Sequence, residues 1–305
     1  YLGMIIDQMN RIYGFGNALI DVEIQIEDDE LESINIKKGN MRHISEDELK
    51  TFMDRFSNNI NSRLPGGSIA NSLYAANQHG ASIHFSCSVG NDDYGDYFID
   101  SFGGNENLIS YERSSLPTGV CLIFVTKDGQ RTMAAHLGAN LDLNEKALNL
   151  KKLKNSNYLL FDNFSLSSKN GLTTVIAALR EKNNAEVCFG VSDEILINEN
   201  IENLKWLSQN KLDLIYGNRE EINKLKRELD FFANNILETN GKNGASYNGN
   251  IAPAPKIDII NSNGAGDALI GTFLAHKDKY GENTALFKSV GYASRVCTVN
   301  GPRLT

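Results

Sequence analysis

The stretch Ile257–Ala275, IDIINSNGAGDALIGTFLA, decides the fold class because its character changes twice along its length. Ile257–Ile260 is an apolar run that predicts a strand. Residues 263–267 (NGAGD) supply a glycine-rich turn. Ala268–Ala275 then continues as an apolar segment compatible with a helix. The stretch therefore predicts a strand, a tight turn and a helix amino terminus, which is a building unit of parallel α/β proteins.

A glycine turn at a helix amino terminus can bind and stabilise negative charge. The backbone N–H groups of Gly264, Ala265 and Gly266 have no partner within the helix, and together with the helix dipole they form an anion hole. Asp267 stands beside them in the first turn, where a carboxylate can take the proton of a substrate hydroxyl. Phosphoryl transfer needs these two features. The alternative is a simple helix start with a capping aspartate, and the motif alone does not decide between them.

The rest of the chain alternates between strand and helix patterns. Strands are predicted at residues 12–22, 22–26, 82–89, 120–126, 158–161, 187–191 and 212–216. Helices are predicted at residues 45–56, 68–79, 171–182, 201–208, 220–229, 265–277 and 284–299. This alternation predicts an α/β protein whose central, mostly parallel sheet is flanked by helices. Two β-rich segments, at about 20–45 and 108–138, break the pattern, and we interpret them as a small β-sheet lid inserted into a single domain of residues 1–305.

Composition excludes several classes of function. The net charge of −8 disfavours nucleic-acid binding, which requires a basic surface. The four cysteines form no CxxC pair and the five histidines have no metal-ligand spacing, which favours reduced, buried thiols. No apolar run is long enough to cross a membrane, and the first residues do not resemble a signal peptide. We therefore expect a cytoplasmic protein with neither a nucleic-acid nor a membrane partner.

A second motif gives the glycine turn its context. Residues 65–98 contain the pair Gly66-Gly67, then Asn71, an Ala-rich segment and finally a Gly-x-Asp-x-x-Gly pattern that ends at Gly95. With the NGAGD motif near the other end of the sequence, this order resembles the PfkB/ribokinase family of carbohydrate and nucleoside kinases over essentially the whole chain. The resemblance implies a ribokinase-like fold and ATP-dependent phosphorylation of a sugar or nucleoside, with Asp267 as the base.

The same resemblance implies where ATP and Mg²⁺ bind. Asn218 and Glu221 match the family's Asn-x-x-Glu motif, which helps to place Mg²⁺ and the phosphates, with Glu221 acting on the metal through water. Residues 239–244 match a turn that packs against the nucleotide, and in it Thr239, Gly241 and Gly244 are the matching positions. We place Asn263 in the same nucleotide-binding set.

In the lid, the strand predicted at 120–126, a turn at 127–129 and residues 131–135 form a predicted β-hairpin. Arg131 follows the turn of this hairpin. It can reach the phosphates of ATP when the lid closes, and the alternative is a solvated hairpin arginine.

The expected substrate-binding set is Asn17, Asp21, Gly66, Gly67 and Asn71. In nucleoside kinases of this family an Asn and an Asp at the spacing of the first two point into the site, and the carboxylate accepts the sugar hydroxyls.

Three further stretches bear on the branch of the family. Asn261-Ser262 stands where the family commonly has Asp-Thr, so a carboxylate on which a monovalent-cation site would depend is missing. Pro302–Thr305 and Asp28–Gly39 look like the inosine–guanosine kinase branch and bacterial adenosine-kinase-like proteins. We therefore expect phosphorylation of the 5′-hydroxyl of a purine nucleoside, inosine, guanosine or adenosine, in purine salvage. A free sugar such as ribose, fructose or a keto-deoxy sugar acid is the alternative.

Two other classes of protein fit the sequence less well. Gly14-Phe15-Gly16 matches the first part of the GxGxxG dinucleotide-binding motif, but Leu19 stands where the third glycine belongs, which disfavours a dehydrogenase. A binding protein that has lost catalysis is disfavoured by the presence of both the base and the anion hole. By family analogy, the lid could also mediate a homodimer.

Overall fold

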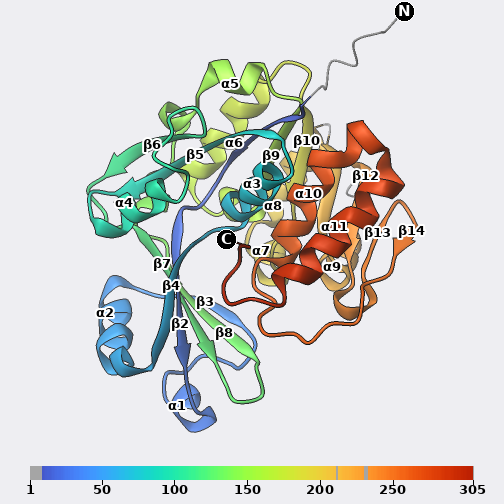
Figure 1. The fold of residues 1–305 in the computed structure, drawn as a ribbon. Coiled ribbons are helices and arrows are strands. Elements are labelled where there is room, and N and C mark those ends of the chain that lie inside the picture. Colours follow the sequence, from blue (N-terminus) through green and yellow to red (C-terminus); the bar gives the residue numbers. More distant parts are fainter. Residues whose placement is uncertain (1–8, 211, 230–232, 305) are drawn as a thin grey trace, which may run out of the picture.

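Two β-sheets of unequal size carry the fold, in a computed structural model that describes residues 9–210, 212–229 and 233–304 (Figure 1). The larger sheet has the strand order β14-β13-β12-β11-β10-β9-β1-β5-β6. Its neighbouring strands from β12 to β6 are parallel, and β13 and β14 are antiparallel additions at one edge. The strands are β1 (Arg11–Phe15), β5 (Ser82–Gly90), β6 (Ile109–Ser114), β9 (Tyr158–Asp162), β10 (Glu186–Gly190), β11 (Leu212–Asn218), β12 (Ala233–Thr239), β13 (Ala245–Tyr247) and β14 (Asn250–Ala252).

Helices cover both faces of this sheet, because successive strand residues are apolar and point to opposite sides. Ile12 and Leu160 pack on the face that α3, α10 and α11 cover, whereas Tyr13 and Leu159 pack on the face of α6, α8 and α9. The helices around the sheet are α3 (Ser68–Gln78), α4 (Asp93–Asp100), α5 (Leu150–Lys154), α6 (Lys169–Glu181), α7 (Glu194–Glu199), α8 (Ile201–Ser208), α9 (Arg219–Glu228), α10 (Ala265–Tyr280) and α11 (Glu282–Val296). The predicted α/β class with a mostly parallel sheet is confirmed.

The smaller sheet has the order β3-β8-β7-β2-β4 and stands apart from the larger one in Figure 1. Its strands are β2 (Leu19–Gln25), β3 (Met41–His43), β4 (Ile60–Gly66), β7 (Gly119–Val125) and β8 (Arg131–His136). Helices α1 (Asp28–Glu32) and α2 (Glu46–Arg55) belong to this part of the chain, and Phe52 and Phe56 pack edge-on against Phe124 of β7. Ser45 and Glu48 form a capping box at the start of α2, where the sequence predicts a helix.

Some of the expected boundaries are wrong. The single strand predicted at 12–22 is two strands, β1 and β2, joined by residues 16–18, where the chain passes from one sheet to the other. The buried amide of Asn140 fixes this crossing, since it accepts from the N–H of Ala18 at 2.7 Å and donates to its carbonyl at 3.0 Å. The segment 109–114, expected in the lid, pairs with β5 in the larger sheet, and β4 was not anticipated at all.

The strand expected at Ile257–Ile260 does not form. Ile259 and Ile260 are each 61% exposed, and the N–H of Ile260 donates to the carbonyl of Cys297 at the end of α11 instead of to a neighbouring strand. Two prolines, Pro253 and Pro255, precede the segment and remove backbone donors, which disfavours a ladder. The helix start at Ala265 is as expected.

Helices α3 and α10 pack side by side with both amino termini at the same end. A Cβ built on Gly271 would lie 1.9 Å from the carbonyl oxygen of Ser72, so the two backbones touch at this point. Towards the carboxyl-terminal ends of the two helices, Nε2 of His276 lies 3.1 Å from Nδ1 of His79. Towards the amino termini the contact reaches Asp267.

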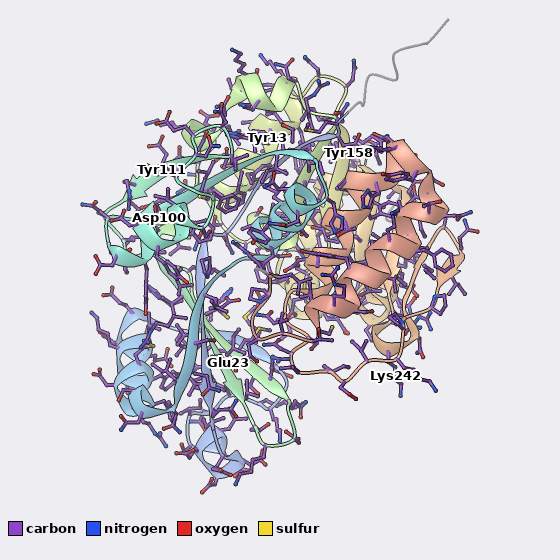
Figure 2. All side chains as sticks on the ribbon, in the orientation of Figure 1. Tyr13, Glu23, Asp100, Tyr111, Tyr158 and Lys242 are labelled. Carbon is purple, nitrogen blue, oxygen red and sulfur yellow. The ribbon has the colours of Figure 1, made fainter. Side chains whose placement is uncertain are left out.

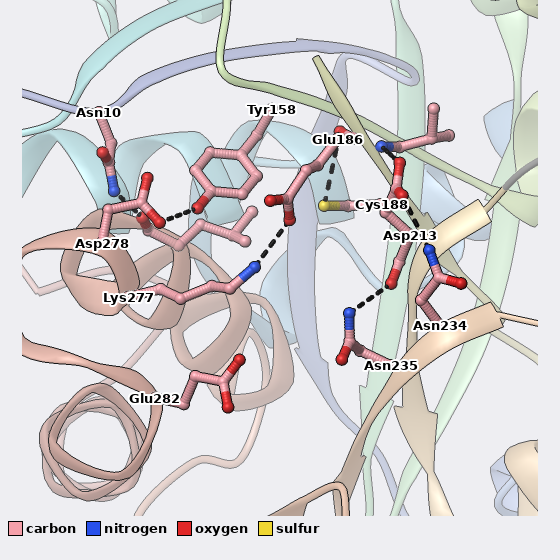
Figure 3. Close-up of polar contacts among 12 residues, drawn as sticks. Asn10, Tyr158, Glu186, Cys188, Asp213, Asn234, Asn235, Lys277, Asp278 and Glu282 are labelled. Atoms are coloured by element: carbon pink, nitrogen blue, oxygen red, sulfur yellow. Dashed lines mark hydrogen bonds and ion pairs between the residues drawn. The ribbon is translucent and has the colours of Figure 1, made fainter. Parts of the chain in front are cut away.

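The far end of α10 is fixed by polar contacts to the amino-terminal ends of the strands (Figure 3). The Tyr158 hydroxyl donates to Asp278 at 2.6 Å, and Lys277 forms an ion pair with Glu186 at 2.7 Å. Asn10 donates to the carbonyl of Leu274 at 2.7 Å. Among the described residues, no helix has the length and the apolar composition to cross a bilayer.

The contact at Gly271 predicts that Gly271→Ala destabilises the fold. The new methyl group has to displace the backbone of α3, and overpacking of this kind costs roughly 1–3 kcal/mol or more. Gly291→Ala in α11 is the matched control, because a Cβ there has no atom within 4 Å. It removes a helical glycine and should raise the free energy of unfolding by about 0.5–1 kcal/mol. Urea unfolding measures both changes. Equal effects of the two variants would contradict the close contact.

Candidate active site

A cavity of about 350 Å³ lies between the smaller sheet and the carboxyl-terminal ends of strands in the larger sheet. This volume suits a small-molecule ligand. Ligands of open α/β sheets bind at this edge of the strands. The residues that line it are Asn17, Leu19, Asp21, Met41, His43, Gly67, Ser68, Asn71, Cys121, Ile123, Met133, Ala135, Leu137, Asp162, Phe164, Ser192, Asp193, Tyr216, Gly217, Asn218, Glu221, Thr239, Asn263, Gly264, Gly266 and Asp267.

The carboxylate of Asp267 lies in the first turn of α10 and is held by α3. Ser68 donates its hydroxyl to one carboxylate oxygen at 2.7 Å, and Asn71 donates its amide to the other at 3.0 Å. Burial raises the pKa of Asp267 above the usual carboxyl value, while these two hydrogen bonds and the charge of Arg303 act in the opposite direction. The result is a fixed carboxylate with enhanced basicity at the wall of the cavity.

The turn before α10 brings only part of the expected anion hole to the cavity. Gly264 and Gly266 line it, and Gly264 has a left-handed backbone with φ of 73°. Ala265 does not line the cavity, and its N–H lies 3.4 Å from the carbonyl oxygen of Ser262. The glycines and the helix amino terminus leave donors and a positive dipole end next to Asp267.

Three successive residues of the same turn region bond to the smaller sheet. Asn261 donates to Glu23, which Figure 2 labels on the smaller sheet, at 3.1 Å. Ser262 accepts from Arg131 at 3.1 Å, and Asn263 donates to Asp21 at 3.1 Å. At position 261 the side chain is therefore an amide that donates to the Glu23 carboxylate, whereas an Asp there would itself be a carboxylate.

The expected substrate-binding residues meet at the start of the smaller sheet. Asn17, Asp21, Gly67 and Asn71 line the cavity. Gly66 does not line it and pairs with Leu19 in the sheet. Burial raises the pKa of Asp21 to about 7, against the hydrogen bond from Asn263 and the charge of Arg303.

The Asn-x-x-Glu motif begins α9 at the other end of the cavity. Asn218 is the N-cap residue and accepts from the N–H of Glu221 at 2.8 Å, while the Glu221 carboxylate accepts from the Asn218 backbone and side chain, each at 2.8 Å. Burial raises the pKa of Glu221 to about 7. Both residues and Thr239 line the cavity. Gly241 and Gly244 lie in the turn after β12 and do not line the cavity. Arg131, at the start of β8, does not line it either.

Of the lining residues not expected from the sequence, two have buried polar atoms without a partner among the residues that the structure describes. Asp162 ends β9 and is only 2% exposed, and its Oδ1 has no hydrogen-bond partner in the described part of the chain. The Tyr216 hydroxyl, on β11, is likewise buried and unpaired there. Burial, and next the charge of Asp267, raise the pKa of Asp162 to about 7. The available signal was a carboxylate directly after a continuous apolar strand, YLLF.

These unpaired oxygens fit a hydrated magnesium ion. Mg²⁺ prefers oxygen ligands and keeps several waters when one or two carboxylates and phosphate oxygens supply the rest. The described residues contain no group of three or more His, Cys, Asp and Glu side chains placed to hold a metal. Asp162 and Glu221, two carboxylates of the cavity wall, would hold such an ion through its waters, and the ion would neutralise phosphate charge there.

The two-sheet fold and the cavity beneath the smaller sheet are those expected of the ribokinase-like class of α/β kinases. Residues 57–304 match the family described as pfkB family carbohydrate kinase, and the chain belongs to this family. It is 24% identical to adenosine kinase 2 of Arabidopsis thaliana over 93% of this chain and 92% of that protein. It is 25% identical to the ribokinase of Staphylococcus aureus (strain COL) over 72% of this chain and 77% of that protein.

The fold has close counterparts among solved structures. The adenosine kinase from Sinorhizobium meliloti superposes with a TM-score of 0.86 and 21% identity, covering 97% of this chain and 96% of that one. The expected ribokinase-like fold is confirmed, and the protein is a kinase. The kinases of this family use ATP, generally with Mg²⁺.

The burial of Asp162, whose Oδ1 has no partner in the described part of the chain, predicts a pH-dependent gain in stability from Asp162→Asn, because burial outweighs the hydrogen bonds from Ser165 and from the backbone of Phe164 that lower its pKa. Because the folded-state pKa is raised to about 7, the folded protein keeps the proton where the unfolded chain has lost it. Stability therefore falls as pH rises from about 4 to 7, and above that the full cost of the buried charge is present. Without ligands, the variant should gain on the order of 1–3 kcal/mol at pH 8 and clearly less at pH 5.

Thermal unfolding at both pH values measures this gain. Asp54→Asn, on the exposed face of α2, is the control and should change stability equally little at both. A loss of stability at pH 8 in Asp162→Asn would contradict a net cost of keeping this buried carboxylate ionised.

Proposed function

We propose that the protein transfers the γ-phosphate of ATP to the 5′-hydroxyl of a purine nucleoside. The observation that carries this proposal is the apolar wall that the smaller sheet adds to the cavity next to Asp21. Its side chains are Leu19, Met41, Cys121, Ile123, Met133 and Ala135. A polyhydroxyl sugar gains little from such a surface, whereas the flat face of a base buries apolar area against it.

The polar groups beside this wall suit a ribose. The Asp21 carboxylate can accept two vicinal hydroxyls, and the amides of Asn17 and Asn71 supply donors and acceptors at the same end of the cavity. A nucleoside held in this way directs its 5′-hydroxyl away from the apolar wall, towards Asp267.

The reaction is an in-line displacement in which Asp267 is the general base. It takes the proton of the 5′-hydroxyl while the oxygen forms a bond to the γ-phosphorus and the bond from that phosphorus to the bridging oxygen of ADP breaks. Ser68 and Asn71 hold the carboxylate in place, and the start of α10, at Gly264–Gly266, stabilises the charge on the transferring group. Bound Mg²⁺ neutralises phosphate charge, and Asp162 and Glu221 would hold it and its waters.

Removing the base should stop turnover without preventing binding. Asp267→Asn keeps the shape: its amide oxygen can still accept from Asn71, and its nitrogen faces the Ser68 hydroxyl, which can accept. The amide is a poor proton acceptor, so kcat should fall by on the order of 10²-fold or more. Calorimetry should still detect nucleoside binding, and thermal unfolding should show a folded protein. A folded variant with wild-type kcat would remove Asp267 from the reaction.

The substrate class is tested by ADP release with MgATP and a panel of inosine, guanosine, adenosine, cytidine, ribose, fructose and a keto-deoxy sugar acid. We expect turnover of a purine nucleoside. Ribose is the second candidate, because the ribokinase relative shares much of the chain. Turnover of free sugars alone would overturn the nucleoside proposal and leave the kinase chemistry in place.

The apolar wall predicts how a variant should discriminate between the two classes. Ile123→Ser removes buried apolar surface from the wall and should raise KM for a nucleoside by roughly 10-fold, with kcat nearly unchanged. Ile251→Ser, on the exposed strand β14, is the control and should leave KM as it is. An unchanged nucleoside KM in Ile123→Ser would show that the base does not lie on this wall.

A further inference from the structure

Arg303 lies behind the candidate base, in the segment that follows α11. It is largely buried, and its guanidinium sits over the rings of Tyr74 at 5.0 Å and Phe102 at 5.6 Å from their centroids. Its Nε donates to Oδ1 of Asn71 at 2.9 Å and its Nη1 to the hydroxyl of Ser101 at 3.2 Å. Thr305, the last residue of the PRLT stretch noted above, lies outside the described residues.

Pro302, the residue before Arg303, packs against the glycine turn at the start of α10. A Cβ on Gly264 would lie 2.5 Å from the carbonyl oxygen of Pro302, so the segment packs directly against the backbone of the turn. The segment therefore touches both parts of the site that face the transferring group: the turn through Pro302, and the Asp267 carboxylate through Arg303 and Asn71.

The hydrogen bond to Asn71 has a directional consequence. An arginine only donates, so it can bond the oxygen of the Asn71 amide but not the nitrogen. With its oxygen held by Arg303, the amide presents its nitrogen to the Asp267 carboxylate, at 3.0 Å. A rotated Asn71 would place its oxygen against the carboxylate and lose both bonds.

We propose that Arg303 is a positioning residue for the transfer reaction, which holds Asn71 in the one orientation that fixes the Asp267 carboxylate. The proposal rests on the proposed role of Asp267 as the base. It extends the site to a residue that contacts neither the cavity nor the reacting atoms.

The charge of Arg303 acts on the same carboxylate. Burial lowers the pKa of Arg303 to about 10, so it stays charged at neutral pH. The groups that face Asp267 are Ser68 and Asn71 on α3, the acidic Asp21 and Asp162 and the phenol of Tyr216 on three strands, and this guanidinium. Arg303 opposes the pKa increase of Asp267 that burial causes, and it does the same for Asp21.

The experiment compares kcat, KM and the pH dependence of kcat for wild type, Arg303→Met and Arg303→Lys. Loss of the charge and the donors in Arg303→Met should lower kcat roughly 10- to 100-fold. It should also move the acidic limb of the kcat profile to higher pH, because the base then keeps its proton longer. Arg303→Lys keeps a charge but not the planar donor geometry, so the limb should return towards its wild-type position while kcat stays lowered.

A double-mutant cycle with Asn71→Ala tests the route of the effect. If Arg303 acts through Asn71, adding Arg303→Lys to Asn71→Ala should lower kcat no further. An undiminished effect of Arg303→Lys in that background would overturn the proposal, as would wild-type kcat and pH profile in Arg303→Met. If Arg303→Met does not fold, the Lys variant and its cycle carry the test.

Arg113→Met is the matched control. Arg113 likewise donates to an amide oxygen, the carbonyl of Gly90 at 2.7 Å, and lies over the ring of Tyr111 at 5.4 Å, and like Arg303 it does not line the cavity. Its side chain bonds to Gly90 and Asp96 and not to Asn71. It should lower thermal stability without shifting the pH profile. Asp267→Asn separates the two proposals. An active Asp267→Asn variant would contradict the role of Asp267 as the base. An inactive Asp267→Asn variant, together with a wild-type pH profile in Arg303→Met, would contradict only the positioning role of Arg303.

Discussion

The site depends on the parallel contact between α3 and α10, where the absence of a side chain at Gly271 lets the backbone of α10 touch that of α3. Parallel helices in contact bring their amino termini to the same place. One terminus supplies Ser68 and Asn71, and the other supplies Asp267 with the glycine turn. A carboxylate is thus bonded by one helix while it lies in the first turn of another. The glycine at the crossing, one helical turn after Asp267, sets the spacing between them.

The electrostatics of the cavity follow from how many acids this arrangement gathers. Asp21, Asp162, Glu221 and Asp267 all line it, and burial raises the pKa of each. Such a wall repels a bare triphosphate, so phosphate binding here requires cations as well as the helix amino terminus. Oδ1 of Asp162, which has no partner in the described residues, is a buried acceptor to which a hydrated cation could donate through its waters.

Local signals made much of the fold predictable. The capping box at Ser45 and the apolar spacing of the helices depend on neighbours within a few residues, and these elements are present. What failed depends on distant partners. The strand expected at Ile257–Ile260 has the right composition, but the end of α11 takes one of its donors. Ile109–Ser114 forms a strand, in agreement with its β-rich composition. It belongs to the larger sheet because it pairs with β5, and that partner is distant in the sequence.

The candidate site divides in the same way. Asp267, Asn71 and Glu221 belong to motifs whose spacing is visible in the sequence, and the structure places them around one cavity. Ser68 was expected only as the start of a helix, and Asp162 and Arg303 were given no role. Ser68 and Arg303 act through contacts across 199 and 232 positions, and Asp162 through burial at a strand end. A carboxylate that ends a buried strand, and an arginine within a segment after the last helix, become informative only once packing is known.

The contacts between the turn before α10 and the smaller sheet connect binding to the position of that sheet. Three consecutive residues, 261 to 263, bond to Glu23, Arg131 and Asp21, so the sheet and the start of α10 are linked without a ligand. A carboxylate oxygen has room for more than one donor, so a substrate hydroxyl can join the Asn263 amide on Asp21 without displacing it. If Asp21 binds the substrate as proposed, binding adds a bond to an existing link and so couples substrate occupancy to the turn proposed to stabilise the transferring phosphate.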